Sequence, residues 1–199
     1  MKKILLIATN NINKLKEIKE ILRNIPFQIK SLTEVGFKDK ITETGKSYHE
    51  NARYKAQFVG KKTGLLTLAE DSGLEIDFLN GKPGIYSARY SAGSDRERIN
   101  KVLRQLERIP EGKRSARFVC VAALFNPQTN KTIFFEGESK GFITDKPLGK
   151  SGFGYDPIFF NFDLEKTNAQ VSLEEKNRVS HRTRALLKAN KFLINIQNL

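Results

Sequence analysis

The 199-residue sequence predicts an α/β fold with a mixed sheet and flanking helices. Residues 3–9 (KILLIAT) have the composition of a buried strand, and they lead through Asn10-Asn11 into a segment with helical periodicity. Residues 115–126 and 131–138 are two strand-like segments around the turn NPQTN, which indicates a hairpin. Strands joined both by helices and by a hairpin predict a sheet of mixed direction.

Four segments have the spacing of amphipathic helices. The first follows the opening strand and ends at Pro26, and the second is preceded by Ser47 and Glu50 in a capping-box pattern. Further helices are expected over residues 95–106 and from about Ser180. The positions expected to face inward are Ile12, Leu15, Ile18 and Leu22; Tyr48, Ala52, Ala56 and Val59; Ile99, Val102, Leu103 and Leu106; and Val179, Leu186, Ala189 and Leu193.

The stretch LTLAEDSGLEIDFL, residues 66–79, interrupts two apolar runs with two adjacent carboxylates. We expect strands over residues 65–69 and 74–79. Asp, Ser and Gly all serve turns, so the interruption is consistent with a hairpin. It is equally consistent with a metal or phosphate site at the end of a strand, and the segment alone does not decide between them.

Length and composition predict a soluble globular protein. Apolar residues make up 39% and charged residues 29%, which is ordinary for a globular protein. We see no linker, so a single domain over residues 1–199 is expected. The apolar runs are too short to cross a bilayer, and the N-terminus lacks a signal-peptide cleavage pattern. The single cysteine, Cys120, is expected to be a core residue in a reducing compartment, which predicts a cytoplasmic location.

The formal net charge of +13 has three interpretations. It could serve nucleic-acid binding, where Lys and Arg neutralise phosphates. It could attract a small polyanionic substrate through the field of the protein. It could also reflect only a bias toward Lys codons. The charge alone gives the three about equal weight.

The segment ATNNINK is the first candidate site. A strand that enters a helix through small polar residues presents backbone N–H groups at the helix N-terminus, where anions bind. Thr9, Asn11 and Asn13 add side-chain donors, and Lys14 adds a positive charge. The alternative is that the asparagines simply cap the helix.

Glu43 and Asp71 are the candidate metal ligands. Asp71 follows an apolar strand, and Glu43 precedes the second helix. Mg²⁺ is held by one or two carboxylates together with water and substrate phosphate oxygens, so two hard oxygen ligands would suffice. Glu43 by itself also fits an ordinary solvated acid. With only two histidines in the chain, a zinc site is not expected.

Two later segments carry further candidates. In GKSGFGYDPIFF, Gly152 and Gly154 flank Phe153, which could stack on a base, or the aromatic residues could fold into the core. In SLEEKNRVSHRTRALL, Ser172 and Glu175 suit a capping box. The donors of this second segment could form a site or a solvated basic face; they are Lys176, His181 and Arg182.

Taken together, these segments resemble the inosine triphosphate pyrophosphatase family. ATNNINK, ETGKSYHENA, AEDSGLEID, PGIYSARYS, GFGYDPIF and EEKNRVSHRTRAL occur here in the family's order, from about residue 3 to residue 195. The resemblance implies an elongated two-lobed α/β fold with a central cleft. Three positions differ from residues that are frequent in the family, and none is a proposed metal ligand: Asn10, Tyr48 and Glu70.

The resemblance also implies a function. The protein would be a Mg²⁺-dependent pyrophosphatase that hydrolyses dITP, ITP and XTP to the monophosphate and pyrophosphate, removing non-standard purine nucleotides from the pool. Glu43 and Asp71 would hold Mg²⁺, and Asp71 would accept a proton from the attacking water. The triphosphate would be bound by Thr9, Asn10, Asn11, Ile12, Asn13, Lys14, Lys55, Ser72 and Lys176. The base would contact Phe153, Gly154, Tyr155, Asp156, His181 and Arg182.

The resemblance further implies a homodimer, with no nucleic-acid or membrane partner. A nucleic-acid-binding protein is the rival suggested by the charge. A related pyrophosphatase acting on modified pyrimidine triphosphates is a closer rival, but the SHR element argues for purines.

Overall fold

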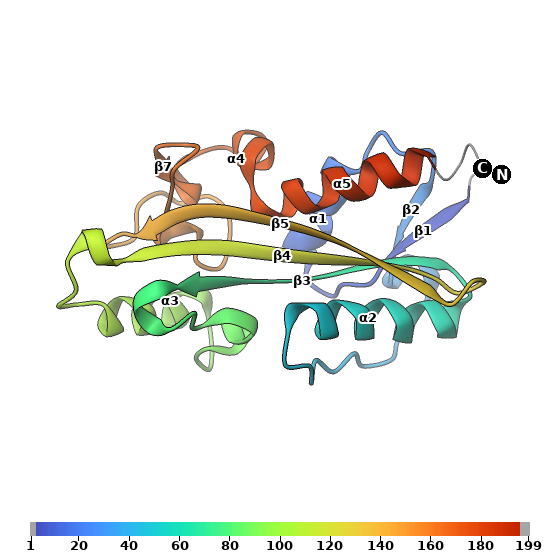
Figure 1. The fold of residues 1–199 in the computed structure, drawn as a ribbon, viewed down its shortest axis with the longest axis horizontal. Helices are drawn as coiled ribbons and strands as arrows, with labels where there is room; N and C mark the ends of the chain where they lie inside the picture. The colour runs from blue at the N-terminus through green and yellow to red at the C-terminus, as the bar shows by residue number, and fades with distance from the viewer. Residues whose placement is uncertain (1–2, 196–199) are drawn as a thin grey trace. The chain divides into compact units, whose positions relative to one another are not determined.

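Seven strands form one mixed sheet in the order β2-β1-β3-β4-β5-β6-β7 (Figure 1). The structure is a computed structural model and describes residues 3–195. The strands are β1 (Ile4–Ile7), β2 (Gln28–Ser31), β3 (Leu66–Ile76), β4 (Ser115–Asn126), β5 (Lys131–Ile143), β6 (Phe159–Asn161) and β7 (Lys166–Thr167). The helices are α1 (Ile12–Ile21), α2 (Tyr48–Thr63), α3 (Asp95–Gln105), α4 (Leu173–Val179) and α5 (His181–Asn195). The predicted α/β class with a mixed sheet and flanking helices is confirmed.

The chain divides into two compact units. The first comprises Met1–Asp71, Cys120–Gly137 and Arg182–Leu199, and the second comprises Ser72–Val119 and Glu138–His181. Strands β3, β4 and β5 contribute residues to both units. No helix within residues 3–195 is both long enough and apolar enough to cross a membrane.

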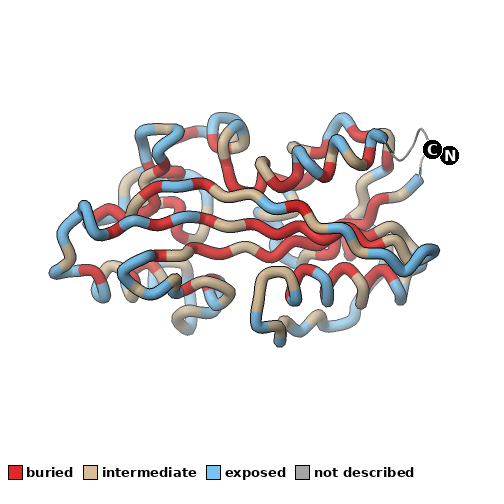
Figure 2. Tube along the Cα trace, in the orientation of Figure 1, coloured by how far each residue is buried: buried red, intermediate tan, exposed pale blue. Residues whose placement is uncertain are grey.

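In the first unit, helices cover both faces of the sheet. β1 pairs in parallel with β2 and with β3. Successive strand side chains point to opposite faces, so Leu5 and Ile7 pack with α1 and α5, whereas Leu6 and Ala8 pack with α2. Figure 1 shows α2 on one side of these strands and α1 and α5 on the other. Figure 2 shows the buried residues concentrated along the strands, and burial of both faces explains the continuous apolar run of β1.

The second unit has its own apolar core. Helix α3 contributes Ile99 and Val102, which pack with Leu74 and Ile76 of β3. The strand pairs β5–β6 and β6–β7 are antiparallel. The inward positions predicted for the helix over residues 95–106 are confirmed by its packing in this core.

Capping side chains mark the starts of three helices. The Oδ1 atom of Asn11 accepts from the backbone N–H of Lys14 at 3.1 Å, at the start of α1. The Oγ atom of Ser47 accepts from the backbone N–H of Glu50 at 3.1 Å, at the start of α2. Ser172 begins α4 in a complete capping box. The helix starts predicted at Ser47 and Ser172 are confirmed.

The strand boundaries differ from the prediction around residues 70–73. β3 runs from Leu66 to Ile76 without a break, so the two strands expected over residues 65–69 and 74–79 are one. The prediction of a hairpin and the prediction of a strand end at this point are both wrong, because Glu70 and Asp71 lie inside the strand. Residues 77–79 form a 3-10 turn.

The last helical segment also differs. Val179 ends α4, and α5 begins at His181, so Val179 does not belong to the final helix as expected. Strand β5 extends past residue 138 to Ile143. The short strands β2, β6 and β7 carry too few residues to show a periodicity of their own, and they were not predicted.

Gly60 allows α2 to pack closely on the sheet. A Cβ atom at Gly60 would lie 2.5 Å from Cδ1 of Phe125 and 3.2 Å from Oγ1 of Thr67. Phe125 is fully buried in the core beneath α2, so its ring has little room to move. The close packing offsets the low helix propensity of glycine at this position.

We expect Gly60→Ala to lower the free energy of unfolding by about 1–3 kcal/mol, because overpacking outweighs the gain in helix propensity of about 1 kcal/mol. Urea denaturation followed by circular dichroism measures the change. Lys61→Ala, on the exposed side of the same helix, is the control and should change stability little. A Gly60→Ala variant as stable as the wild type would show that α2 can shift without cost.

Candidate active site

Two adjacent carboxylates are buried in the middle of β3. Glu70 and Asp71 have exposed fractions of 2% and 4%. Because successive side chains of a strand point to opposite faces, the two carboxylates meet different helices. Glu70 contacts residues of α1 and α5, and Asp71 contacts residues of α2. A buried charge is costly unless it is paired, so each face has to supply its own partners.

Glu70 is part of a chain of alternating charges. Its Oε1 atom lies 2.9 Å from Nζ of Lys14 and 3.3 Å from Nη2 of Arg182. The Nη1 group of Arg182 donates to Oε2 of Glu17 at 2.5 Å. Burial alone would raise the pKa of Glu70, but Arg182 and Lys14 outweigh it and hold that pKa well below its ordinary value. Glu70 is therefore an ionised carboxylate that pairs with two cations.

Cys120 lies beside this chain of charges. Its Sγ atom donates to Oε2 of Glu70 at 3.3 Å, and the residue is fully buried. Burial, with the charge of Glu70 adding to it, raises the pKa of Cys120 well above its ordinary value. The thiol stays protonated, which agrees with the prediction of a core cysteine.

Asp71, on the other face, is held by α2. Nδ2 of Asn51 donates to its Oδ2 atom at 2.9 Å, and Nζ of Lys55 lies 3.4 Å from its Oδ1 atom. Lys55 also donates to Oε1 of Glu43, so one ammonium group joins two carboxylates. Oδ1 of Asn51 accepts from the backbone N–H of Gly45 at 2.9 Å, which ties the segment carrying Glu43 to the helix.

The electrostatics of this cluster suit a proton acceptor. Burial raises the pKa of Asp71; Lys55 opposes this effect and Glu43 adds to it. Burial would lower the pKa of Lys55, but Asp71 and Glu43 together raise it, so the ammonium group keeps its charge. A carboxylate with a raised pKa is better able to take up a proton near neutral pH than an ordinary one.

Glu43 and Asp71 are also the candidate metal ligands in the described structure. The ammonium group of Lys55 lies between them, so the surroundings stabilise a cation at this position. Carboxylate oxygens are hard donors, and Mg²⁺ is often held by one or two of them with substrate phosphates completing its shell. Within residues 3–195 no group of three or more His, Cys, Asp or Glu side chains is arranged to hold a metal. A metal here would depend on additional oxygen ligands.

The predicted anion-binding segment joins β1 to α1. Asn11 caps the helix with its Oδ1 atom, and its backbone N–H donates to Oγ1 of Thr9 at 3.1 Å. The capping interpretation is therefore confirmed for Asn11, while the helix N-terminus still favours an anion through its backbone dipoles. Lys14 lies in the first turn, where it pairs with Glu70. The exposed members of the segment are Asn10, Asn11, Ile12 and Asn13. The inward position predicted for Ile12 is therefore wrong, because this residue lies at the exposed start of α1.

In the second unit, Asp156 organises the Gly-rich loop. Its Oδ2 atom accepts from the backbone N–H of Phe153 at 2.9 Å and from Nζ of Lys176 at 2.5 Å. Its Oδ1 atom accepts from Nδ2 of Asn168 at 3.1 Å. Nζ of Lys176 also lies 4.9 Å from the centroid of the Phe153 ring, in a cation–π contact. Gly152 is required here, because φ is +76° and a Cβ atom would lie 2.2 Å from Oδ2 of Asp156.

Two further loop residues are tied to the same unit. The hydroxyl of Tyr155 donates to the backbone oxygen of Ser87 at 2.9 Å, and burial raises the pKa of Tyr155. The backbone N–H of Gly154 donates to Oδ2 of Asp95 at 2.7 Å. Tyr155 thus belongs to the core, as the alternative interpretation of this loop held, whereas Phe153 remains partly exposed.

The basic segment that begins at Lys176 is not a solvated face. Lys176, His181 and Arg182 have exposed fractions of 2%, 4% and 1%, so that alternative is wrong. The ring of His181 stacks on Phe118 with centroids 4.7 Å apart and planes 12° from parallel. Arg182 is engaged by the two carboxylates described above. The contact of His181 and Arg182 with a base edge stays a prediction.

The structure brings the predicted residues into two clusters, each within one unit. Glu43, Lys55 and Asp71 meet in the first, with the neighbouring Lys14 paired to Glu70. The loop around Asp156 and Lys176 forms the second. Ser72 follows Asp71 in β3 and is partly buried.

Sequence reasoning missed the residues that orient the predicted ones: Glu17, Asn51, Asp95 and Asn168. Asn51 had a usable signal, because Asn51 and Lys55 are four residues apart and share one face of a helix. Glu17 likewise lies three residues after Lys14. Asp95 and Asn168 are separated by many residues from the groups they bind, and nothing local indicated them.

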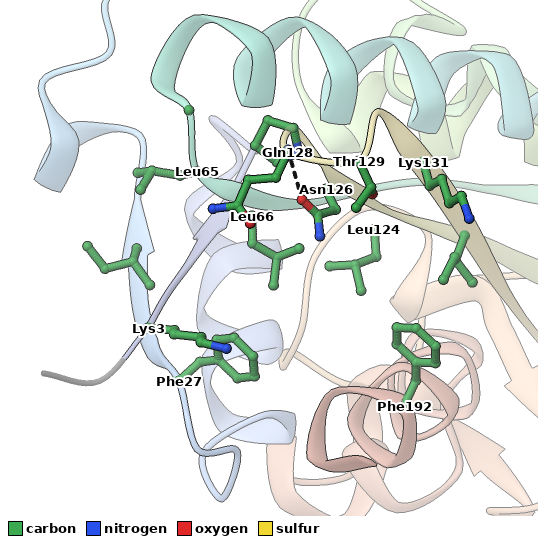
Figure 3. A pocket seen from close by; sticks show the side chains of 14 residues that line it. Lys3, Phe27, Leu65, Leu66, Leu124, Asn126, Gln128, Thr129, Lys131 and Phe192 are labelled. Carbon is green, nitrogen blue, oxygen red and sulfur yellow. Dashed lines mark hydrogen bonds between the residues drawn. The ribbon is translucent and has the colours of Figure 1, made fainter. Parts of the chain in front are cut away.

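The first unit also contains a cavity of about 510 Å³ that is not part of either charged cluster (Figure 3). Its lining includes Lys3 at the start of β1, Leu65 and Leu66 near the start of β3, and Phe192 of α5. None of the predicted site residues lines it, and the anion-binding segment follows the other end of β1. No carboxylate lines the cavity, so the candidate site is placed at the charged clusters instead.

Comparison with known proteins gives close matches over nearly the whole chain. A model of the Ham1 family matches residues 5–192. A dITP/XTP pyrophosphatase of Bacillus subtilis (strain 168) is 47% identical over 191 residues, covering 94% of this chain and 96% of that protein. A dITP/XTP pyrophosphatase of Geobacter sulfurreducens is 47% identical over 184 residues, covering 92% of each.

Solved structures agree with these matches. A HAM1 protein from Coxiella burnetii has a TM-score of 0.88 and 41% identity, over 97% of this chain and 99% of that one. The Ham1 protein of Staphylococcus aureus has a TM-score of 0.85 and 39% identity, over 96% of this chain and 98% of that one. The resemblance drawn from the motifs is confirmed.

We expect Arg182→Met to lower the free energy of unfolding at pH 7 by about 3–5 kcal/mol, because Glu17 and Glu70 would lose their shared buried cation. The folded-state pKa of Glu70 is lowered, so its contribution to stability is present above its unfolded-state value near 4.5 and is lost as the pH falls below it. The deficit of the variant should therefore shrink toward pH 4. Urea denaturation at the two pH values measures it.

Arg178→Met is the matched control, because Arg178 forms an exposed pair with Glu174. This variant should lose less than about 1 kcal/mol at either pH. Equal losses in the Arg178 and Arg182 variants would contradict a structural role for the buried chain of charges.

Proposed function

The chain belongs to the Ham1 family, and from that premise we propose that it is a nucleoside-triphosphate pyrophosphatase. It hydrolyses the non-standard purine nucleotides dITP, ITP and XTP to the monophosphate and pyrophosphate. Relatives named dITP/XTP pyrophosphatase support the substrate class. The observation that carries the chemistry is the carboxylate pair of Glu43, which is partly buried, and Asp71, which is buried, joined by one lysine.

The donor set fits a magnesium ion. Glu43 and Asp71 already share a cation, the ammonium group of Lys55, and both offer hard oxygen atoms. We assign Mg²⁺ to these two carboxylates. When bound, it would offset the negative charge that develops on the phosphates during cleavage.

Asp71 is the proposed proton acceptor. A water molecule attacks the α-phosphorus, and a proton of that water passes to the Asp71 carboxylate. The bond between the α-phosphorus and the bridging oxygen then breaks, and pyrophosphate leaves. Burial raises the pKa of Asp71, which favours proton uptake, and Asn51 orients the carboxylate by donating to its Oδ2 atom.

Positive charge and backbone dipoles bind the triphosphate in this proposal. Lys14 and Lys55 contribute charge, and the N-terminus of α1 contributes backbone N–H groups. Ser72, which follows Asp71 in β3, is assigned a further phosphate contact. Lys176 was expected to bind phosphates as well, but it pairs with Asp156, so we assign it to the base-binding loop. The remaining phosphate contacts come from Thr9, Asn10, Asn11, Ile12 and Asn13.

The Gly-rich loop of the second unit is assigned to the base. Phe153 is partly exposed and would stack on the purine, a contact worth roughly 1–3 kcal/mol. Asp156 and Lys176 fix the loop, Gly154 and Tyr155 complete it, and His181 is assigned to the base edge. Arg182 was expected at that edge as well, but its guanidinium group is buried against Glu17 and Glu70, so we assign it a structural role. The homodimer implied by the family resemblance belongs to the same proposal, as does the cytoplasmic location expected from the single core cysteine.

We expect purified protein with Mg²⁺ to hydrolyse dITP, ITP and XTP far more efficiently than GTP, with ATP lowest. The 6-oxygen of hypoxanthine and xanthine accepts hydrogen bonds, whereas the 6-amino group of adenine would face the donor His181. Sites built around a required hydrogen bond reject the wrong partner by about 10⁴–10⁵-fold. Values of kcat/KM from pyrophosphate release test the order.

Similar efficiency on ATP and ITP would refute the assignment of the base edge. Release of phosphate in place of pyrophosphate would refute the reaction itself.

Asp71→Asn should reduce turnover of dITP by about 10²-fold or more while leaving the circular dichroism spectrum unchanged, because the amide can neither accept the proton nor offer a charged ligand. Asp77→Asn is the control, since Asp77 is exposed just beyond β3 and should keep full activity. An Asp71→Asn variant that retains more than about a tenth of the activity would exclude the proton-acceptor role.

A further inference from the structure

Lys55 lies between the two carboxylates assigned to the metal ion. Its ammonium group donates to Glu43 and lies 3.4 Å from Oδ1 of Asp71. We propose that Lys55 is a built-in counter-ion that occupies the carboxylate pair until the nucleotide arrives, so that the divalent cation and the triphosphate enter together. This inference rests on the proposed function, and it makes Lys55 a positioning residue as well as a phosphate-binding one.

The surroundings hold Lys55 in this place. Its exposed fraction is 7%, and the side chain points from α2 toward β3. Asn51, one helical turn earlier, binds the other oxygen of Asp71 and so fixes that carboxylate relative to the helix. The segment carrying Glu43 is tied to Asn51 through Gly45. Three separate parts of the chain thus converge on one ammonium group.

A cation is needed here whether or not a nucleotide is bound. Asp71 is buried and Glu43 is partly buried, and the two carboxylates would repel each other without a positive charge between them. Removing the cation from a buried ionic cluster is strongly destabilising. Lys55 meets this need in the nucleotide-free protein.

A divalent cation and the ammonium group compete for the same carboxylate oxygens. Mg²⁺ is usually bound through one or two carboxylates together with substrate phosphates. The triphosphate supplies further ligands for the metal and new acceptors for the displaced ammonium group. Each ligand therefore raises the affinity for the other, and this coupling is reciprocal.

The test measures Mn²⁺ binding to the nucleotide-free protein at pH 8 by electron paramagnetic resonance. Wild type should bind Mn²⁺ weakly, and Lys55→Gln should bind it roughly tenfold or more tightly, because a positive charge near the metal has been removed. Lys55→Arg keeps the charge and should bind as weakly as the wild type. Lys61→Gln makes the same charge change on the exposed side of α2 and should also match the wild type.

A second measurement uses the wild type alone, in case Lys55→Gln folds poorly. Chemical labelling of lysine amines, quantified by mass spectrometry, should show Lys55 becoming more reactive relative to Lys61 as Mn²⁺ saturates the site. Unchanged labelling of Lys55 in Mn²⁺-saturated protein would overturn the proposal.

The outcomes separate this inference from the proposed function. If the wild type binds Mn²⁺ as tightly as Lys55→Gln, the counter-ion role is wrong, while the metal site and the pyrophosphatase activity can both stand. If no protein binds Mn²⁺ even at millimolar concentration, the assignment of Glu43 and Asp71 as a metal site fails, and the counter-ion proposal fails with it. Absence of pyrophosphate release from dITP would reject the proposed function independently.

Discussion

Two adjacent buried carboxylates in β3 each need their own partners, and this requirement constrains the rest of the first unit. Glu70 and Asp71 point to opposite faces of the sheet, so neither can share the other's direct partners. Glu70 requires cations from α1 and α5, and Asp71 requires Asn51 and Lys55 from α2. The positions of three helices are therefore tied to one point of one strand, in addition to the apolar packing on each face.

Periodicity and capping patterns predicted most of the helical structure, because these signals are local, but they placed Val179 in the last helix instead of at the end of α4. Ser47 and Ser172 cap helices where the sequence placed them. The course of β3 could not be predicted in this way, since Glu, Asp, Ser and Gly disfavour strands or serve turns. The cations that permit buried charges inside that strand come from Lys14, Lys55 and Arg182, and only the folded chain brings them there.

The residues of the candidate site could be proposed from their chemistry, but the ion pairs between them could not be predicted. Carboxylates at Glu43 and Asp71 indicated a hard cation, and the structure places one ammonium group between them. The segment containing Arg182, taken alone, favoured a solvated face, because burial of an arginine depends on carboxylates far away in sequence. Glu17 and Glu70 provide them, and a search for acidic residues at helical spacing could have found only the first.

The alternation of Glu70 and Asp71 also limits how this part of the gene can evolve. An insertion or deletion of one residue in β3 before Glu70 would exchange the faces on which the two carboxylates lie. The glutamate would then meet the lysine and asparagine of α2, and the aspartate would meet Arg182, with every apolar neighbour inverted as well. Changes in length are therefore expected in the connections outside the strand rather than within it.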